Sequence, residues 1–393
     1  MAHNFNASQR IAQIQDPVIP HIAQLIRENP GTINFGQGTV NYSPPDEANE
    51  AIHAFFTDPL NHRYKAVDGL PQLKQNIYKK LADENNIDIS QNWTLFVTAG
   101  SNMGFLHAVL AITDPGDEII QLSPYYFNHE MAIRMANAVP ITVETDPHYQ
   151  PDIEKIAAAI TNKTKAIVTI SPNNPTAAVY PKATLIAINQ LCAQHGIYHI
   201  NDEAYEYFVY DDVQHYSPAS HTEAYSHTIS LFSFSKTYGM ASRRIGYMLA
   251  PQHLDKALRK IQDTNLICAP VISQVAASAA IQQGRSFCRP HIDTLRQHRT
   301  LISQALSQHT DVLSFTPPNG AFYFFMRTAT SLNSLELAQR LIEKHKVAVI
   351  PGETFGETTR CSFRIAYGAL SRTEISEGIT RIISGLNQSI RKY

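Results

Sequence analysis

The sequence predicts an α/β protein whose large domain holds a seven-stranded, mainly parallel sheet sandwiched by helices, next to a smaller α+β domain. The first observation is a set of seven short, nearly continuous apolar runs between residues 94 and 251, such as "AIVTI" and "TISLF". Strands that are covered on both faces have this composition. The second observation is that helix-like segments separate most of these runs, which favours parallel strands.

The predicted elements follow one another in a regular order. The seven runs begin at Thr94, Asp117, Val139, Lys165, Ile197, Thr228 and Arg244. Helical patterns over residues 105–112, 153–160 and 182–194 lie between them. Only the segment "KTYGMASR" separates the last two runs, which leaves no room for a helix. We therefore expect the last strand to be antiparallel to the one before it.

The character of the chain changes near residue 285. An amphipathic stretch over 285–309, a helical pattern over 334–346, several apolar runs and a last helical pattern from Thr373 indicate a second, α+β unit. We assign residues 46–284 to the large domain, and residues 1–45 with 285–393 to the small one. The segment up to Pro45 is rich in turns and too short to fold alone, so we expect it to pack on the small domain.

Composition argues against several classes of protein. The formal net charge of −2 comes without the basic stripe of a nucleic-acid binder. The four cysteines form no CxxC pair, which argues against a metal cluster and a disulfide framework and fits a reducing compartment. The start, "MAHNFNASQRIAQIQ", has no apolar core of signal-peptide length, and no stretch approaches the ~20 apolar residues of a membrane span. We expect a cytoplasmic protein without a metal site and without nucleic-acid or membrane partners.

Polar groups gather where the predicted strands end, which is where open α/β sheets bind ligands. The first strand leads into Gly100, Ser101 and Asn102, a small-residue turn that opens a helix and suits a phosphate. The later strand ends carry Tyr125 and Tyr126, Asn174, Asp202 and Tyr205, and finally Ser233 and Lys236. Pyridoxal phosphate needs this set, because it takes a lysine for a Schiff base, a carboxylate facing its pyridinium nitrogen, and an anion site.

The stretch "SFSKTYGMASRRIGY" resembles the lysine motif of the fold-type I pyridoxal-phosphate enzymes, in the class I/II aminotransferase group. "TAGSNMG", "SPNNPTAAVY", "NDEAY" and "SFRIAYG" resemble further motifs of that group. The resemblance implies that Lys236 forms the Schiff base and acts as general acid and base. It implies that Ser233 and Arg244 bind the phosphate. Arg243 has no clear role, and the site, a dimer interface and the surface all stay open for it.

The same resemblance implies roles for the groups around the cofactor ring. Asp202 faces the pyridinium nitrogen, while Asn174 and Tyr205 reach the ring 3′ oxygen. The turn at Gly100, Ser101 and Asn102 binds the phosphate. Tyr126 stacks on the ring, with Tyr125 as the alternative.

Three further matches concern the substrate and the neighbouring subunit. "INFGQGTVNYSPP" resembles the loop that closes over the substrate near Gly36, and Arg364 in "SFRIAYG" clamps the substrate α-carboxylate beside Asn174. "YKAVDGLPQLKQ" resembles an element whose tyrosine, here Tyr64, reaches the phosphate of the neighbouring subunit. This match implies a homodimer with shared active sites.

Two positions depart from the family pattern. Ala177 stands where a glycine usually follows N-P-T, and Ser242 stands where a glycine usually lies two residues before Arg244. Ala177 is expected to change the turn slightly, but neither position removes a chemical group.

The resemblance implies an enzyme that moves the α-amino group of an L-amino acid to a 2-oxo acid. A C–S β-lyase or a cyclising synthase on the same scaffold is the alternative, since the same lysine and aspartate serve those reactions. An effector-sensing domain is disfavoured because no DNA-binding module accompanies it. Asn102 occupies a position where an aspartate-specific branch has a lysine, which disfavours dicarboxylates. "FGQG" and "PYY" resemble branches that act on kynurenine, glutamine, methionine or aromatic amino acids.

Overall fold

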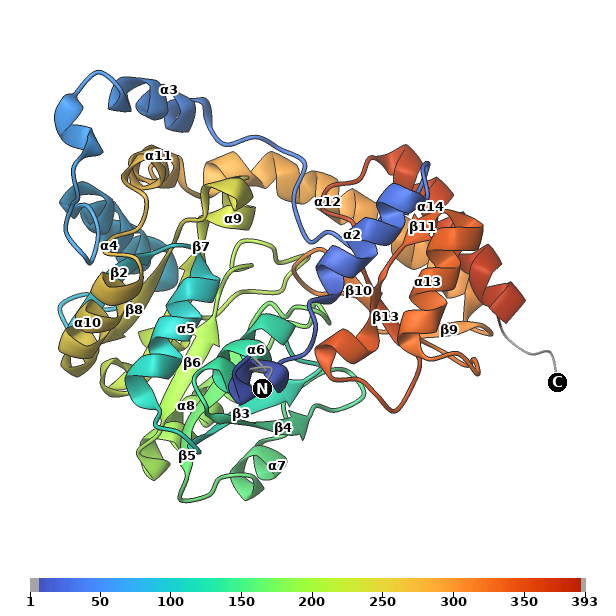
Figure 1. The fold of residues 1–393 in the computed structure, drawn as a ribbon, viewed down its shortest axis with the longest axis horizontal. Helices are drawn as coiled ribbons and strands as arrows, with labels where there is room; N and C mark the ends of the chain where they lie inside the picture. Colours follow the sequence, from blue (N-terminus) through green and yellow to red (C-terminus); the bar gives the residue numbers. More distant parts are fainter. Residues whose placement is uncertain (1–6, 390–393) are drawn as a thin grey trace, which may run out of the picture.

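The computed structural model describes residues 7–389 and builds the chain around a seven-stranded sheet (Figure 1). The strand order is β2-β8-β7-β6-β5-β3-β4, and β8 is antiparallel to both of its neighbours. The strands are β2 (Trp93–Thr98), β3 (Glu118–Ser123), β4 (Val139–Glu144), β5 (Thr164–Ile170), β6 (Tyr198–Asp202), β7 (Thr228–Ser233) and β8 (Gly246–Pro251). The predicted fold class, all seven strands and the antiparallel last strand are confirmed.

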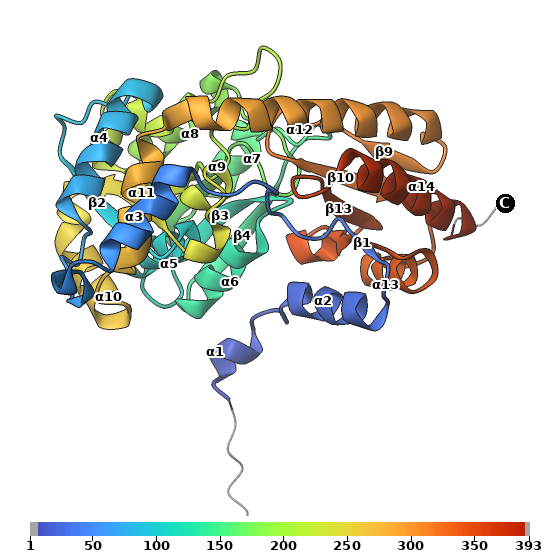
Figure 2. The ribbon, with the colours of Figure 1, turned by 90° about the horizontal axis from the view of Figure 1, so that it is seen from above.

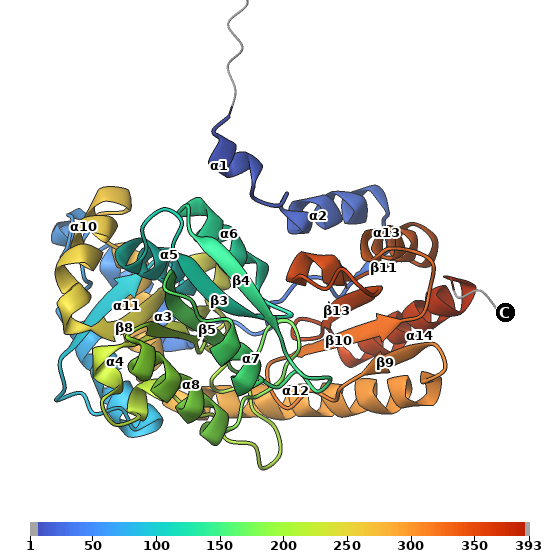
Figure 3. The ribbon, with the colours of Figure 1, turned by 90° about the horizontal axis from the view of Figure 1, so that it is seen from below.

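Helices cover both faces of this sheet because side chains along a strand alternate between the two faces. Phe96 of β2 packs in a cluster with Phe105 of α5, whereas its neighbours Leu95 and Val97 belong to the cluster on the opposite face. Figure 3 shows α5 (Ser101–Ile112) and α6 (Phe127–Met135) on one side, and α7 (Ile153–Ala158) and α8 (Lys182–His195) on the other. The other helices packed around this sheet are α3 (Asp46–Phe55), α4 (Pro71–Asn85), α9 (Phe234–Thr237), α10 (Asp255–Asn265) and α11 (Val271–Ile281).

A second, antiparallel sheet of four strands has the order β12-β13-β10-β9. Its strands are β9 (Leu313–Phe315), β10 (Tyr323–Thr328), β12 (Ile350–Pro351) and β13 (Ser362–Ala366). Three helices accompany it, namely α12 (Gly284–Leu306), α13 (Ser334–His345) and α14 (Arg372–Ser389), where the sequence predicts helices. The run "VAVIPG" is divided, because β11 (Val347–Ala348) leaves this sheet and pairs with β1 (Ile33–Asn34).

Helix α12 runs from the large sheet to the small one (Figure 2). Near its start, Phe287 stacks on Tyr238 with ring centroids 6.0 Å apart, while Leu295 and Ile302 join the core cluster that contains β10 and β13. The division of the chain at residue 284 therefore stays a prediction, because one continuous helix packs on both units.

The N-terminal segment is more helical than the sequence indicated. It forms α1 (Gln9–Ala12) and α2 (Val18–Glu28), with Pro17 as N-cap and Pro20 in the first turn of α2. Prolines are tolerated in a first turn, but in a sequence they suggest turns, which explains the difference. Helix α2 lies beside α13, whereas α1 lies beside α6 and the Tyr42 hydroxyl donates to the Lys236 carbonyl at 2.6 Å. The segment thus contacts both units.

Short 3-10 turns complete the structure at Pro59–His62, Pro218–Ser220, Ala224–Ser226, Ala241–Arg243, Gln252–Leu254, Ser307–His309 and Gly352–Phe355. Among residues 7–389, no helix combines the length and the apolar character that crossing a membrane requires.

Candidate active site

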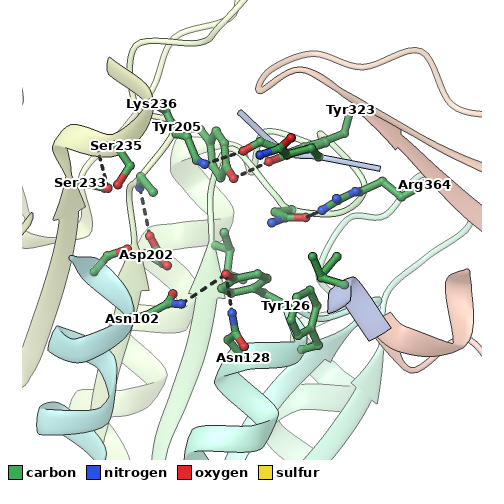
Figure 4. Close-up of a pocket in the computed structure, with 18 of the residues that line it drawn as sticks. Asn102, Tyr126, Asn128, Asp202, Tyr205, Ser233, Ser235, Lys236, Tyr323 and Arg364 are labelled. Carbon is green, nitrogen blue, oxygen red and sulfur yellow. Dashed lines mark hydrogen bonds between the residues drawn. The ribbon is translucent and has the colours of Figure 1, made fainter. Parts of the chain in front are cut away.

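A cavity of about 440 Å³ opens at the carboxyl ends of the large sheet's parallel strands and extends to the small sheet (Figure 4). Eleven of the residues predicted from the sequence line it: Gly36, Ser101, Asn102, Tyr126, Asn174, Asp202, Tyr205, Ser233, Lys236, Arg244 and Arg364. Gly100 directly precedes this lining at the start of α5. Residues from five strand ends and from the N-terminal loop therefore meet at one place.

Lys236 lies on α9, the short helix that follows β7. The Ser233 hydroxyl caps this helix by accepting the Ser235 N–H at 3.1 Å. The Lys236 ammonium donates to the Gly38 carbonyl of the N-terminal loop. Burial, followed by the charges of Arg364 and Arg244, lowers the pKa of Lys236 from 10.5 to about 8. Since only a neutral amine is nucleophilic or basic, this shift prepares Lys236 for chemistry near neutral pH.

Asp202 ends β6 and is buried at the floor of the cavity. Its Oδ1 accepts the Ala204 N–H at 3.0 Å, and His129 Nε2 lies 3.2 Å from its Oδ2. The His129 ring stacks on Phe105, with centroids 3.8 Å apart and planes 14° apart, which fixes its orientation. The sequence analysis gave no role to His129 and did not place it beside Asp202.

The end of the cavity near α5 has the features of an anion site. Gly100 has φ of +84°, and a Cβ there would lie 2.5 Å from Arg244 Nη2. A Cβ on Gly246 would lie 2.9 Å from the Ser101 nitrogen, so both positions require glycine. The free N–H groups at the start of the 12-residue α5 and the guanidinium of Arg244 converge there. The Ser233 and Ser235 hydroxyls also line the cavity. This donor set and close backbone approach fit a phosphate group.

Tyr126 and Tyr125 take different positions. Tyr126 lines the cavity, and its hydroxyl accepts hydrogen bonds from Asn128 at 2.8 Å and from Asn102 at 3.5 Å. Tyr125 packs instead against Gly356, where its ring fills the space of a Cβ. The geometry therefore favours Tyr126 as the aromatic group beside a bound ring.

Arg364 of β13 lies at the opposite end of the cavity and is only 3% exposed. Its Nη1 donates to Asn174 Oδ1 and its Nη2 to the Gly36 carbonyl, both at 2.8 Å. The guanidinium lies between two rings, 4.6 Å from the Tyr323 centroid and 5.0 Å from that of Phe355. Its buried Nε has no hydrogen-bond partner within residues 7–389. A carboxylate is the group that satisfies a guanidinium held in this way.

The cavity also contains residues that the sequence interpretation missed. They are Pro17, Ile19, Pro20, Gln37, Gly38, Phe127, Asn128, Ile170, Ala204, Ser235 and Tyr323. Ser235 had a signal, because it lies inside the lysine motif. Tyr323 had none, because "AFYFF" has the pattern of a buried strand.

Besides Gly100 and Tyr125, two more of the residues considered from the sequence, Tyr64 and Arg243, do not line the cavity. Tyr64 is 81% exposed and follows the 3-10 turn Pro59–His62. Arg243 is half-buried in the turn before β8, where its carbonyl accepts the Ser273 hydroxyl at 2.8 Å. Neither Arg243 nor Tyr64 therefore belongs to the cavity lining of its own chain.

Ala177 adopts a left-handed conformation with φ of +61°. Its N–H donates to the Asn173 carbonyl at 3.0 Å, and its carbonyl accepts the Gly320 N–H at 3.0 Å. These bonds hold a residue other than glycine in a left-handed conformation, which is a source of local strain. The expected change in the turn stays a prediction, and Asn174 lines the cavity.

Comparisons with known proteins agree with this geometry. The sequence profile of the family described as "Aminotransferase class I and II" matches residues 30–382. The chain belongs to this family. It is 31% identical over 391 residues to an aromatic aminotransferase of Arabidopsis thaliana, covering 97% of this chain and 96% of that protein. It is 33% identical over 365 residues to a probable aspartate/prephenate aminotransferase of Aquifex aeolicus, covering 91% of each.

Among solved structures, a double mutant of Thermus thermophilus aspartate aminotransferase matches with a TM-score of 0.89 and 30% identity, over 97% of this chain and 100% of that one. The predicted family and enzyme class are thereby confirmed: the protein is a pyridoxal-phosphate-dependent aminotransferase. These aminotransferase relatives favour transamination over the β-lyase and cyclising-synthase alternatives.

Proposed function

We propose that this aminotransferase moves the α-amino group of an L-amino acid to a 2-oxo acid with Lys236 as the catalytic base. The observation that carries the proposal is the cavity itself, in which a lysine of lowered pKa lies between an anion site and a buried arginine. Pyridoxal phosphate, when bound, supplies an electron-withdrawing ring that stabilises negative charge at the substrate Cα. The amine of Lys236 takes the proton from that Cα and would deliver it to the cofactor, since returning it to Cα would only regenerate the amino acid.

The other cavity residues bind and orient. The start of α5 at Gly100, Ser101 and Asn102 holds the phosphate, together with Ser233 and Arg244. Asp202 pairs with the pyridinium nitrogen, and its negative charge keeps that nitrogen protonated. Asn174 and Tyr205 contact the 3′ oxygen, and Tyr126 covers one face of the ring.

Arg364 is proposed to bind the substrate α-carboxylate. Its two Nη groups are already held by Asn174 and the Gly36 carbonyl, so the guanidinium plane is fixed before the substrate arrives. A fixed plane orients the substrate as well as attracting it, which places the Cα proton toward Lys236.

The substrate side chain is proposed to be uncharged and largely apolar. The cations of the described lining are Lys236, Arg244 and Arg364, and each of them already has a role. The remaining wall includes Pro17, Ile19, Pro20 and Phe127. A second carboxylate would lose its hydration against this wall without gaining a charged partner. A screen of twenty amino donors, with Asp and Glu against Met, Leu and Phe, tests this proposal, and a preference for Asp or Glu would contradict it.

The role of Lys236 is tested with Lys236→Ala. We expect kcat to fall by about 10²–10⁴-fold or more, because the general base is removed. Lys260→Ala is the matched control, since Lys260 is an exposed lysine on α10. Near-wild-type turnover by Lys236→Ala would refute the assignment, and an equal loss in Lys260→Ala would show a non-specific effect.

The partner of the protein is proposed to be a second copy of itself, with Tyr64 of each subunit reaching the phosphate site of the other. Tyr64 is exposed, and so are Phe56 and Leu60, which precede it closely in the sequence and are 60% and 51% exposed. An exposed apolar group of this kind is typical of an interface. The four cysteines are unpaired, in line with the cytoplasmic location that we also propose.

Subunit mixing tests the shared site. A heterodimer of Lys236→Ala and Tyr64→Ala subunits contains one intact site, which combines Lys236 of one chain with Tyr64 of the other. When equal amounts reassort at random, about half of the dimers are heterodimers, and each of these has one intact site of two. Mixing should therefore restore about a quarter of wild-type activity. Mixing Lys236→Ala with Asp202→Ala is the control, because both changes lie in the same chain's share of the site. Restoration in the control, or none in the test pair, would refute the shared site.

A further inference from the structure

Tyr323, the first residue of β10, contacts three parts of the proposed site. Its side chain is 1% exposed and lines the cavity (Figure 4). Its hydroxyl oxygen lies 2.6 Å from that of Tyr205, a hydrogen-bond distance. Its ring lies 4.6 Å from the guanidinium carbon of Arg364. A Cβ on Gly38 would lie 2.6 Å from the Tyr323 hydroxyl, so the N-terminal loop also packs against it.

The number of hydrogens fixes the direction of the bond between the two tyrosines. A phenol carries one hydrogen to donate. If Tyr205 donates that hydrogen to the cofactor's 3′ oxygen, the Tyr205 oxygen is left as an acceptor toward Tyr323. The Tyr323 hydroxyl has Tyr205 as its hydrogen-bond partner and no other within residues 7–389. The hydrogen between the two oxygens must then come from Tyr323.

We propose that Tyr323 is a positioning residue, whose hydroxyl donates to Tyr205 and thereby aims the single hydrogen of Tyr205 at the 3′ oxygen. This inference rests on the proposed role of Tyr205. Hydrogen bonds in a chain polarise one another, so the bond from Tyr323 strengthens the donation by Tyr205. Burial raises the pKa of Tyr205 well above its usual value and that of Tyr323 to about 12. Both phenols therefore keep their hydrogens over the working range of pH.

The ring of Tyr323 has a separate effect through Arg364. A cation over an aromatic face is attracted by it, and the attraction grows when both are shielded from water. The hydroxyl and the ring can be removed independently, because Tyr323→Phe deletes only the hydroxyl. The two substitutions Tyr323→Phe and Tyr323→Leu therefore separate the two contacts.

The test is the pH titration of the cofactor's visible absorbance band in the holoenzyme. A hydrogen bond donated to the 3′ oxygen stabilises negative charge on that oxygen, so weakening the bond raises the titration midpoint. We expect Tyr205→Phe to raise it by about 1 pH unit, the effect of one hydrogen bond to a charged group. Tyr323→Phe should raise it by about 0.2–0.4 unit, because it weakens that bond without removing it. The double variant should match Tyr205→Phe alone.

Kinetics give a second readout. Tyr323→Phe should leave KM for the amino donor unchanged, because the ring still lies under Arg364. Tyr323→Leu should raise that KM by about 2–5-fold, the effect of one cation–π contact. Tyr367→Phe is the matched control, since Tyr367 is also fully buried, donates to another tyrosine hydroxyl at 3.3 Å, and does not line the cavity. It should shift neither the midpoint nor KM.

Three outcomes would overturn the inference. An unshifted midpoint in Tyr323→Phe, beside a shift in Tyr205→Phe, would show that the hydroxyl does not act on Tyr205. A further shift when Tyr323→Phe is added to Tyr205→Phe would show that Tyr323 acts by another route. An unshifted midpoint in Tyr205→Phe would refute the role of Tyr205 itself, with the inference built on it. In that case the test of Lys236→Ala still decides the proposed function independently.

Discussion

Replacing Lys236 by methionine should stabilise the cofactor-free protein while abolishing its activity. The folded chain lowers the pKa of Lys236 from 10.5 to about 8, first by burial and then by Arg364 and Arg244. Folding therefore opposes protonation of this amine. Below pH 8 the amine is nevertheless protonated, and its buried charge destabilises the folded state. Methionine has similar length and no charge, so it removes this cost.

The size of the stabilisation expected in Lys236→Met follows from the pKa shift of Lys236. A difference of about 2.5 pH units corresponds to about 3.4 kcal/mol when both states are protonated. The amine faces a cavity that is open to water, and its hydrogen bond to Gly38 is lost in the variant, so we expect about 1–2 kcal/mol. The sign is set by linkage: between pH 8 and 10.5 the unfolded chain binds more protons, so wild-type stability rises with pH. The advantage of Lys236→Met is full below pH 8 and vanishes above 10.5.

Urea unfolding of both cofactor-free proteins at pH 7 and near pH 10.5 measures this difference. The midpoint of Lys236→Met should be higher at pH 7, with an unchanged m-value, and should converge with wild type at the higher pH. Lys260→Met, on the exposed face of α10, should show no pH-dependent difference. An advantage of equal size at both pH values would refute the electrostatic reasoning, because packing alone does not titrate in this range.

Three further substitutions test other parts of the structure. Ala177→Gly relieves about 1–2 kcal/mol of Cβ strain at φ +61° against an entropic cost of about 0.5–1 kcal/mol. Urea unfolding should therefore show a gain in stability of up to about 1.5 kcal/mol, and a loss would contradict the strain. Arg364→Lys keeps the positive charge but loses the planar guanidinium that can bind a carboxylate with two hydrogen bonds. The kcat/KM for amino acids should fall about 10–100-fold, chiefly because KM rises, and an unchanged KM would mean that the substrate α-carboxylate binds elsewhere. Lys80→Met leaves Glu206 buried without its ammonium partner, so thermal unfolding should show that the free energy of unfolding falls by about 3–5 kcal/mol. The double variant Lys80→Met/Glu206→Gln should recover most of this loss, whereas no loss in Lys80→Met would mean that water enters to solvate Glu206.

The large sheet could be predicted from the sequence because each strand has its own local signal. Strands buried on both faces are continuous apolar runs, and the missing helix between β7 and β8 fixes their antiparallel pairing. The motif residues converge because parallel strands end at one edge of the sheet, as Asp202 and Lys236 illustrate. These are consequences of local pattern combined with a general topological rule.

Other features depend on contacts between distant residues, which no local pattern encodes. Tyr323 meets Tyr205 across 118 positions of sequence, and its run "AFYFF" only indicates a buried strand. His129 reaches Asp202 because α6 and β6 lie in adjacent layers, not because of its neighbours in sequence. Helix α2 was missed because Pro17 and Pro20 obscure its start, while its position is set by packing against α13.

The two arginines of the cavity affect the protonation of Lys236, the proposed reactive group. A guanidinium keeps its charge at any working pH, so Arg244 and Arg364 cannot relieve their mutual repulsion with Lys236 by losing a proton. The relief falls on Lys236, whose pKa drops as a result of burial and of these two charges. If Arg244 and Arg364 bind phosphate and carboxylate as proposed, their charges have a second effect, because they also favour the neutral form of the Lys236 amine. Anions bound at the two proposed sites would offset these positive charges, and burial, the largest cause of the pKa shift, would remain. The pKa of Lys236 is thus lowest before the proposed anions bind, and burial keeps lowering it after they bind, when Lys236 is proposed to act as the base.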